Sequence, residues 1–192
     1  MARILVFDNY DSFTYNLVQA VVQTGKHTVD VVLNDEIQLE LADSYDGIVL
    51  TPGPGLPSDA GSLLPLIRLY KSKKRIFGVC LGQQAIAEVF GASLVNLENV
   101  FHGVATPVTF MKPRHYLFEG LPDTIEAGRY HSWIVERNTL PDCLRIDALD
   151  ERGQIMALSH KTLDICGVQF HPESVLTPFG RDIISNWLGK FN

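Results

Sequence analysis

Cys80 stands between two glycines at the point where an apolar run gives way to a helical pattern. The segment "GVCLG" at 78–82 has the spacing of the G-x-S-x-G turn, in which small flanking residues permit a strained strand-to-helix bend that exposes a nucleophile. The positive end of the following helix also favours a thiolate. The pattern favours a cysteine nucleophile, although a buried thiol that only fills space is the alternative for any single cysteine.

A base for this nucleophile lies far along the chain, in "GVQFHPES" at 167–174. His171 and Glu173 are two residues apart after an apolar run, and alternate residues of an extended segment project the same way. Pro172 favours extended backbone at His171. We therefore expect the carboxylate of Glu173 to orient the imidazole, with the other ring nitrogen facing the thiol. A histidine that only completes its hydrogen bonds at a strand end is the alternative.

The segment "TPGPGLP" at 51–57 offers backbone N–H donors for an oxyanion. Gly53 and Gly55 carry free N–H groups, and the N–H of Leu81, directly after the nucleophile, is the natural second donor. The segment lacks the third glycine of G-x-G-x-x-G and any Walker lysine, so it does not fit a phosphate loop. A stiff turn after a strand is the alternative.

Regular elements that would position these residues alternate through the first half of the chain. Apolar runs predict strands, and amphipathic runs predict helices, the first capped by Asp11 or Ser12 and ended by Gly25. The predicted strands cover 3–8, 28–34, 46–51 and 75–80, and the predicted helices 12–25, 59–70 and 82–91. This alternation indicates an α/β fold with an open, mostly parallel sheet flanked by helices, which collects ligands at the carboxyl ends of its strands.

The pattern changes after residue 92, where short β-like runs are separated by turn residues. We expect these runs, "ICGVQFH" at 165–171 among them, to add antiparallel strands in the C-terminal half, followed by a last helix over 177–191. No repeat or linker marks a boundary, so residues 1–192 are predicted to form a single domain.

Composition excludes several classes of protein. A formal charge of −6 argues against nucleic-acid binding, and no apolar run reaches the roughly 18 residues that span a membrane. Three cysteines and no signal segment indicate the reducing cytoplasm. The histidines show no metal-ligand spacing, so no metal site is expected. We expect His102 and His131 to be surface or packing residues, and assign no role to Cys143 or Cys166.

Five motifs occur in the order typical of one enzyme family. On these motifs the chain resembles class I, triad-type glutamine amidotransferases, and among them the glutaminase components of anthranilate synthase and aminodeoxychorismate synthase. Their fold is flavodoxin-like. The motifs are "DNYDSFTYNL" at 8–17, "TPGPGLP" at 51–57, "GVCLGQQAIAEVFG" at 78–91, "RYHSW" at 129–133 and "GVQFHPES" at 167–174.

The resemblance implies that Cys80 attacks the side-chain amide of L-glutamine, with His171 as base and then acid and Glu173 as its orienter. It implies no cofactor in this chain, and it places the oxyanion donors on Gly55 and Leu81. A chorismate-binding synthase large subunit is the implied hetero-oligomeric partner that receives the ammonia. The implied substrate-binding residues are Gly53, Pro54, Gly55, Leu81, Gln84, Ser132 and Trp133.

At three positions the chain departs from many relatives. Gln83 replaces a histidine, Val104 a lysine and Trp133 a leucine. These changes leave partner docking and the fit around glutamine open, as well as the product, which is anthranilate, aminodeoxychorismate or both. The alternatives are a stand-alone cysteine hydrolase of γ-glutamyl substrates and a non-catalytic regulatory subunit.

Overall fold

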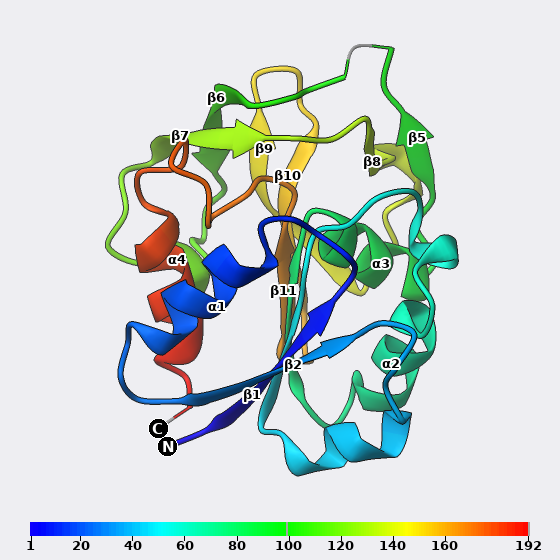
Figure 1. The fold of residues 1–192 in the computed structure, drawn as a ribbon. Coiled ribbons are helices and arrows are strands. Elements are labelled where there is room, and N and C mark those ends of the chain that lie inside the picture. Colours follow the sequence, from blue (N-terminus) through cyan, green and yellow to red (C-terminus); the bar gives the residue numbers. More distant parts are fainter. Residues whose placement is uncertain (99, 192) are drawn as a thin grey trace.

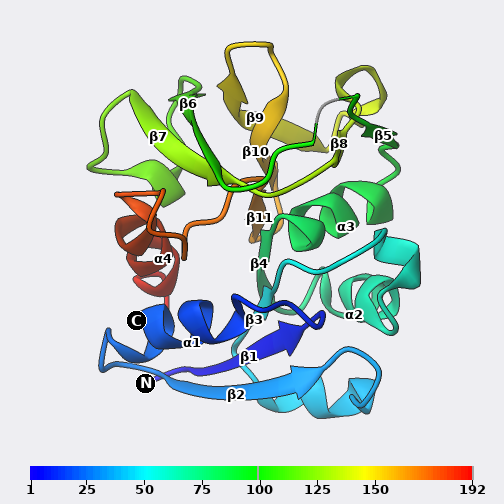
Figure 2. The ribbon, with the colours of Figure 1, turned by 45° about the horizontal axis from the view of Figure 1, so that its top comes forward.

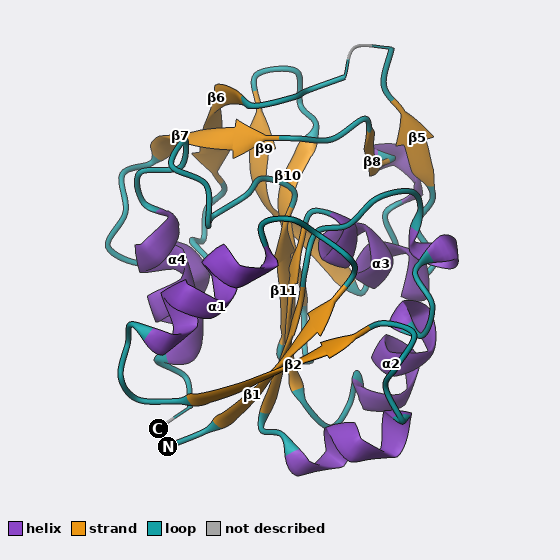
Figure 3. Cartoon of the chain, viewed as in Figure 1, coloured by secondary structure: helices purple, strands orange, loops and turns teal. Residues whose placement is uncertain are grey.

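A nine-stranded sheet forms the centre of the molecule, and a separate two-stranded sheet lies at one side (Figures 1 and 3). The structure is a computed structural model that describes residues 1–98 and 100–191. The strand order is β2-β1-β3-β4-β11-β10-β9-β6-β7, and β5 pairs with β8 in the small sheet. From β2 to β11 neighbouring strands are parallel, and from β11 to β7 they are antiparallel.

The elements alternate in the first half of the chain as the sequence predicts. The strands are β1 (Arg3–Asp8), β2 (Thr28–Leu33), β3 (Gly47–Leu50), β4 (Arg75–Val79), β5 (Leu94–Asn96), β6 (Val104–Phe110), β7 (Thr124–Arg129), β8 (Trp133–Val135), β9 (Leu144–Asp150), β10 (Ile155–His160) and β11 (Ile165–Val168). The helices are α1 (Thr14–Val22), α2 (Leu63–Tyr70), α3 (Leu81–Val89) and α4 (Gly180–Leu188). In the described ranges no helix is both long and apolar enough to cross a membrane.

Helices cover both faces of the parallel part of the sheet. Figure 2 shows α1 and α4 on one side of it and α2 and α3 on the other. Residues 4–7 of β1 are all apolar for this reason: Ile4 and Val6 pack in the cluster beneath α1 and α4, whereas Leu5 and Phe7 pack in the cluster beneath α2 and α3. All four side chains are fully buried, and each such burial contributes roughly 1.5–3 kcal/mol.

Three helix starts differ from the predictions by two residues or more, and one of them is α4, which begins at Gly180 rather than at 177. α1 begins at Thr14, and the carboxylate of Asp11 accepts from the N–H of Phe13 at 2.8 Å, so neither Asp11 nor Ser12 caps the helix itself. α2 begins at Leu63 rather than at 59, because Pro57–Asp59 forms a short 3-10 helix and Gly61 takes a positive φ of 51°. Gly25, with φ of 66°, follows the end of α1 as predicted.

β11 is the strand that the C-terminal half contributes to the parallel part of the sheet. We expected "ICGVQFH" among added antiparallel strands, and β11 does pair antiparallel with β10. On its other side, however, β11 pairs parallel with β4, with Gly167 opposite Gly78 and Val168 opposite Val79. The segments that follow β4 and β11 therefore leave the same edge of the sheet as neighbours.

Backbones approach closely where β4 turns into α3. A Cβ atom at Gly78 would lie 2.5 Å from the carbonyl carbon of Gly82, and one at Gly82 would lie 2.5 Å from the carbonyl oxygen of Leu50. Real side chains do not tolerate these distances from backbone atoms. The glycines at 78 and 82 are thus required by the contact of α3 with β3 and β4.

We predict that Gly82→Ala lowers the free energy of unfolding by roughly 1–3 kcal/mol, because the new methyl group must displace the backbone of Leu50. Urea denaturation of the two proteins measures the change. Gly189→Ala is the matched control, since a Cβ there lies 3.3 Å from the nearest atom and φ is −61°. Equal urea midpoints for wild type and Gly82→Ala would contradict the prediction.

Candidate active site

Cys80 occupies a strained turn between β4 and α3. Its φ of 51° and ψ of −102° place it outside the regions that non-glycine residues favour. Its N–H donates to the carbonyl of Val168 at 2.8 Å, so the turn is fixed to the end of β11. The residue is 6% exposed and directly precedes the first turn of α3. Strained backbone held in this way is common at functional sites.

His171 and Glu173 form a buried pair beside this turn. Nδ1 of His171 lies 2.6 Å from Oε1 of Glu173, and the two side chains are 3% and 0% exposed. Burial alone would lower the pKa of His171, but the thiol of Cys80 and the carboxylate of Glu173 outweigh it and raise that pKa well above its ordinary value. Nε2 of the ring has no hydrogen-bond partner among the described residues. The ring is thus held as a proton donor or acceptor next to the sulfur.

Aromatic rings fix the position of the His171 imidazole. The ring of Tyr130 lies 4.8 Å from it between centroids, and the ring of Phe13 packs edge-on at 6.0 Å. Phe13 and Tyr130 also contact each other, with centroids 5.4 Å apart. Phe13 comes from the N-terminal motif, so that segment supports the histidine through packing.

A small cavity of about 160 Å³ opens beside Cys80. Its lining includes most of the site residues predicted from the sequence, together with two residues that were not predicted, Tyr130 and His131. The lining residues are Gly53, Pro54, Gly55, Cys80, Gln84, Tyr130, His131, Ser132 and Trp133. Leu81 starts α3 with its side chain buried, and His171 and Glu173 lie next to Cys80 outside the cavity lining.

Hydrogen bonds join the loop after β1 to the loop after β3, which lines this cavity. Asn9 donates its N–H to Oγ1 of Thr51 at 2.8 Å and its side-chain amide to the Thr51 carbonyl at 2.9 Å. A Cβ at Gly53 would lie 2.6 Å from Asn9 and 2.9 Å from the side chain of Leu81. Gly55 follows with φ of 72°, a conformation that glycine adopts without strain. The glycine loop is therefore held against the start of α3.

Sequence reasoning missed the role of His131 in the cavity wall. We expected a surface or packing residue, but the side chain is 5% exposed and lines the cavity. Nε of Arg129 donates to its Nε2 at 3.1 Å, and Arg129 in turn pairs with Asp150 at 2.8 Å. Burial, and then the charge of Arg129, lower the pKa of His131 to about 3. The ring is therefore neutral near pH 7, with its proton on Nδ1.

Gln169 was also missed, although a signal was present. In the sequence it lies two residues before His171 in a run predicted to be extended, where alternate side chains project the same way. In the structure β11 ends at Val168 and residues 169–170 form a bend. Nε2 of Gln169 lies 3.5 Å from Sγ of Cys80.

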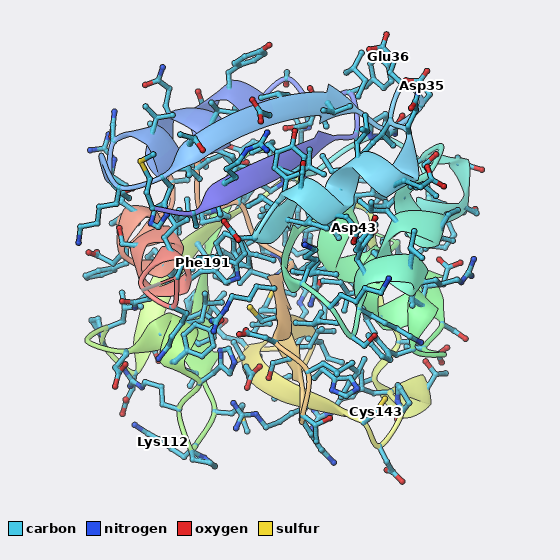
Figure 4. All side chains as sticks on the ribbon, turned by 90° about the horizontal axis from the view of Figure 1, so that it is seen from below. Asp35, Glu36, Asp43, Lys112, Cys143 and Phe191 are labelled. Atoms are coloured by element: carbon cyan, nitrogen blue, oxygen red, sulfur yellow. The ribbon has the colours of Figure 1, made fainter. Side chains whose placement is uncertain are left out.

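Neither of the other two cysteines lines the cavity. Cys166 is buried within β11, where burial raises the pKa of its thiol above the ordinary value. Figure 4, viewed from below, labels Cys143 next to the ribbon that leads into β9.

Comparison with known proteins identifies the family. The model of the glutamine amidotransferase class-I family matches residues 5–191. The chain belongs to this family. This class-I glutamine amidotransferase is 44% identical to aminodeoxychorismate/anthranilate synthase component 2 of Bacillus subtilis strain 168 over 98% of the chain and 96% of that protein. It is 41% identical to anthranilate synthase component 2 of Pseudomonas aeruginosa PAO1, covering 96% of the chain and 94% of the relative.

A solved structure matches the fold of the amidotransferase. The crystal structure of a protein from Thermoplasma acidophilum, provisionally assigned as a GMP synthase subunit, superposes with a TM-score of 0.88 and is 33% identical. The match covers 98% of this chain and 93% of that one. The predicted family and the predicted α/β architecture are thus confirmed, and the chain is a glutamine-hydrolysing component rather than a non-enzymatic protein.

We predict that the ring of His131 stays neutral between about pH 5 and pH 8, because burial and Arg129 both oppose its protonation. NMR titration of the histidine rings, assigned with a His131→Gln variant, measures this. A midpoint near the ordinary value of 6.5 would contradict it.

The same shift predicts the pH dependence of stability. The unfolded chain protonates His131 near pH 6.5 and the folded chain only near pH 3, so the unfolded state binds the extra proton between these values. The free energy of unfolding then falls as pH decreases through this window, by at most about 1.4 kcal/mol per pH unit. Urea denaturation of wild type and His131→Gln at several pH values tests it, and the variant should lack this component.

Proposed function

We propose that this glutamine amidotransferase hydrolyses L-glutamine to glutamate and ammonia with Cys80 as nucleophile. The observation that carries the proposal is the strained Cys80 turn set beside a buried His171–Glu173 pair whose Nδ1 and Oε1 atoms are 2.6 Å apart. Nucleophile, base and orienting carboxylate in this arrangement are the groups that acyl transfer requires. The raised pKa of His171 favours an imidazolium next to a thiolate.

In the first step the thiolate of Cys80 attacks the side-chain carbonyl carbon of glutamine. Backbone N–H groups of Gly55 and Leu81 donate to the oxyanion that forms. The imidazolium of His171 gives its proton to the amide nitrogen, the C–N bond breaks and ammonia leaves. A glutamyl thioester remains on Cys80.

In the second step water hydrolyses the thioester. His171, now neutral, takes a proton from the attacking water, whose oxygen bonds to the same carbonyl carbon. The C–S bond breaks and glutamate leaves, which restores the thiolate and the imidazolium. Glu173 keeps Nδ1 oriented in both steps, so one residue serves as acid and then as base.

The cavity supports the proposed binding of glutamine. Gln84 donates its Nε2 to the carbonyl of Trp133 at 2.8 Å, which leaves its Oε1 without a partner among the described residues. This oxygen is suited to the α-amino group of the substrate. Backbone groups of Gly53, Ser132 and Trp133 complete the proposed site, and Pro54 also lines the cavity.

We propose that the ammonia passes to a chorismate-using synthase subunit. The relatives named above are second components of anthranilate and aminodeoxychorismate synthases, which supports a partner of this kind. Ammonia released into water at neutral pH becomes mostly ammonium, a poor nucleophile, so a partner docked over the cavity would protect it. The product, anthranilate or aminodeoxychorismate, is set by that partner.

We predict that a glutamine analogue carrying a chloroketone labels Cys80 alone, because only this thiol lies in the cavity beside a base. Peptide mass spectrometry locates the label, and Cys143→Ser is the control that should still react. Labelling at Cys143 or Cys166 instead would contradict the assignment.

A second prediction concerns the partner. Pull-down from the native cell extract should recover a chorismate-using large subunit, and the complex should make its product from glutamine or from ammonia. Cys80→Ser should remove glutamine-dependent synthesis and keep ammonia-dependent synthesis. Hydrolysis of γ-glutamyl peptides by the isolated chain, with no partner recovered, would favour the stand-alone hydrolase.

A further inference from the structure

The sulfur of Cys80 has a side-chain donor on Gln169. Nε2 of Gln169 lies 3.5 Å from Sγ, a normal distance for an N–H group and sulfur. The side chain of Gln169 is fully buried, and its backbone N–H donates to the carbonyl of Met156 at 2.8 Å. The backbone of Gln169 is therefore held in place by a hydrogen bond, and its side-chain amide is shielded from water.

The direction of this hydrogen bond follows from a chain of contacts that begins at a backbone carbonyl. The oxygen of Trp133 can only accept, so the atom of Gln84 that lies 2.8 Å from it must be the amide nitrogen. That NH₂ group has a second proton, which it donates to Oε1 of Gln169 at 3.1 Å. The nitrogen of Gln169 is then the atom that faces the sulfur. No other arrangement of the two amides satisfies all three contacts.

We infer that Gln169 is a positioning residue that holds an N–H on the sulfur of Cys80 and so favours the thiolate. An N–H stabilises a charged acceptor more than a neutral one, so it stabilises the thiolate relative to the thiol. The inference rests on the proposed function, because it assumes that the thiolate of Cys80 is the reactive form. It adds a second source of thiolate stabilisation to the imidazolium of His171.

Gln83 shows that burial of a glutamine near Cys80 does not by itself create such a donor. Its side chain is also fully buried, and it follows Cys80 by three residues. Neither atom of its amide has a hydrogen-bond partner among the described residues, and its Cβ and Cγ pack against Gly167. The chain thus offers a matched residue of the same type that does not contact the sulfur.

The test measures the rate at which iodoacetamide alkylates Cys80 in the full chain as a function of pH, with peptide mass spectrometry to count that site alone. Gln169→Met removes the donor at similar volume, and we expect the midpoint of the rate curve to rise by about one to two pH units. Gln169→Glu keeps the acceptor for Gln84 but brings a negative charge to the sulfur, so its midpoint should rise further. Gln83→Met should leave the midpoint unchanged.

Circular dichroism measures whether each variant is folded. If Gln169→Met does not fold, the midpoint of Gln169→Glu decides the test. A purely structural role for Gln169 would lower stability without moving the midpoint, and that result would overturn the inference. An equal shift in Gln83→Met would overturn it as well.

The same comparison in a His171→Ala background separates a direct contact from an effect through the histidine. If the Gln169→Met shift in the alkylation midpoint persists without His171, it supports a direct contact of Gln169 with the sulfur. If the shift disappears, the inference is overturned. Alkylation needs neither glutamine nor a partner. A failure of the partnered wild-type protein to hydrolyse glutamine would therefore contradict the proposed function without changing this readout.

Discussion

The parallel pairing of β4 with β11 is the contact on which the site depends. Val168 lies opposite Val79, and the Val168 carbonyl accepts from the N–H of Cys80 at 2.8 Å. The strands end together, so the segments that carry Cys80 and His171, ninety-one residues apart in the chain, leave the sheet side by side. A strand order in which β11 paired elsewhere would keep every motif and separate the proposed nucleophile from its base.

Close backbone packing makes this arrangement rigid enough to hold strain. The unfavourable φ and ψ of Cys80 persist because the residue is fixed on both sides, by β11 before the turn and by the contact of Gly82 with Leu50 after it. The N-terminal motif adds a further constraint, since Asn9 holds the loop that contains Gly53. A strained conformation of this kind survives only where surrounding structure determines it more than once.

The two histidines of the site differ in charge because their neighbours differ, not because their burial does. Both rings lose hydration, which disfavours their charged forms. His171 lies beside a carboxylate and a thiol, so its charged form is favoured, whereas His131 lies beside the guanidinium of Arg129 and stays neutral. One histidine is suited to transfer protons, and the other forms an uncharged part of the cavity wall.

The family, the alternation of strands and helices, and the residue types of the proposed triad can all be predicted from the amino-acid sequence, because they are local patterns. These patterns are a periodicity, a glycine spacing, and a histidine two residues from a glutamate. The folded structure was needed to show that β11 joins the parallel strands, that α2 starts at Leu63, that Gln169 donates to the sulfur of Cys80, and that His131 lines the cavity. Strand order and the direction of a hydrogen-bond chain depend on partners distant in sequence. No local pattern fixes the strand order or the direction of such a hydrogen-bond chain, because the contacts that stabilise them form only when the chain has folded.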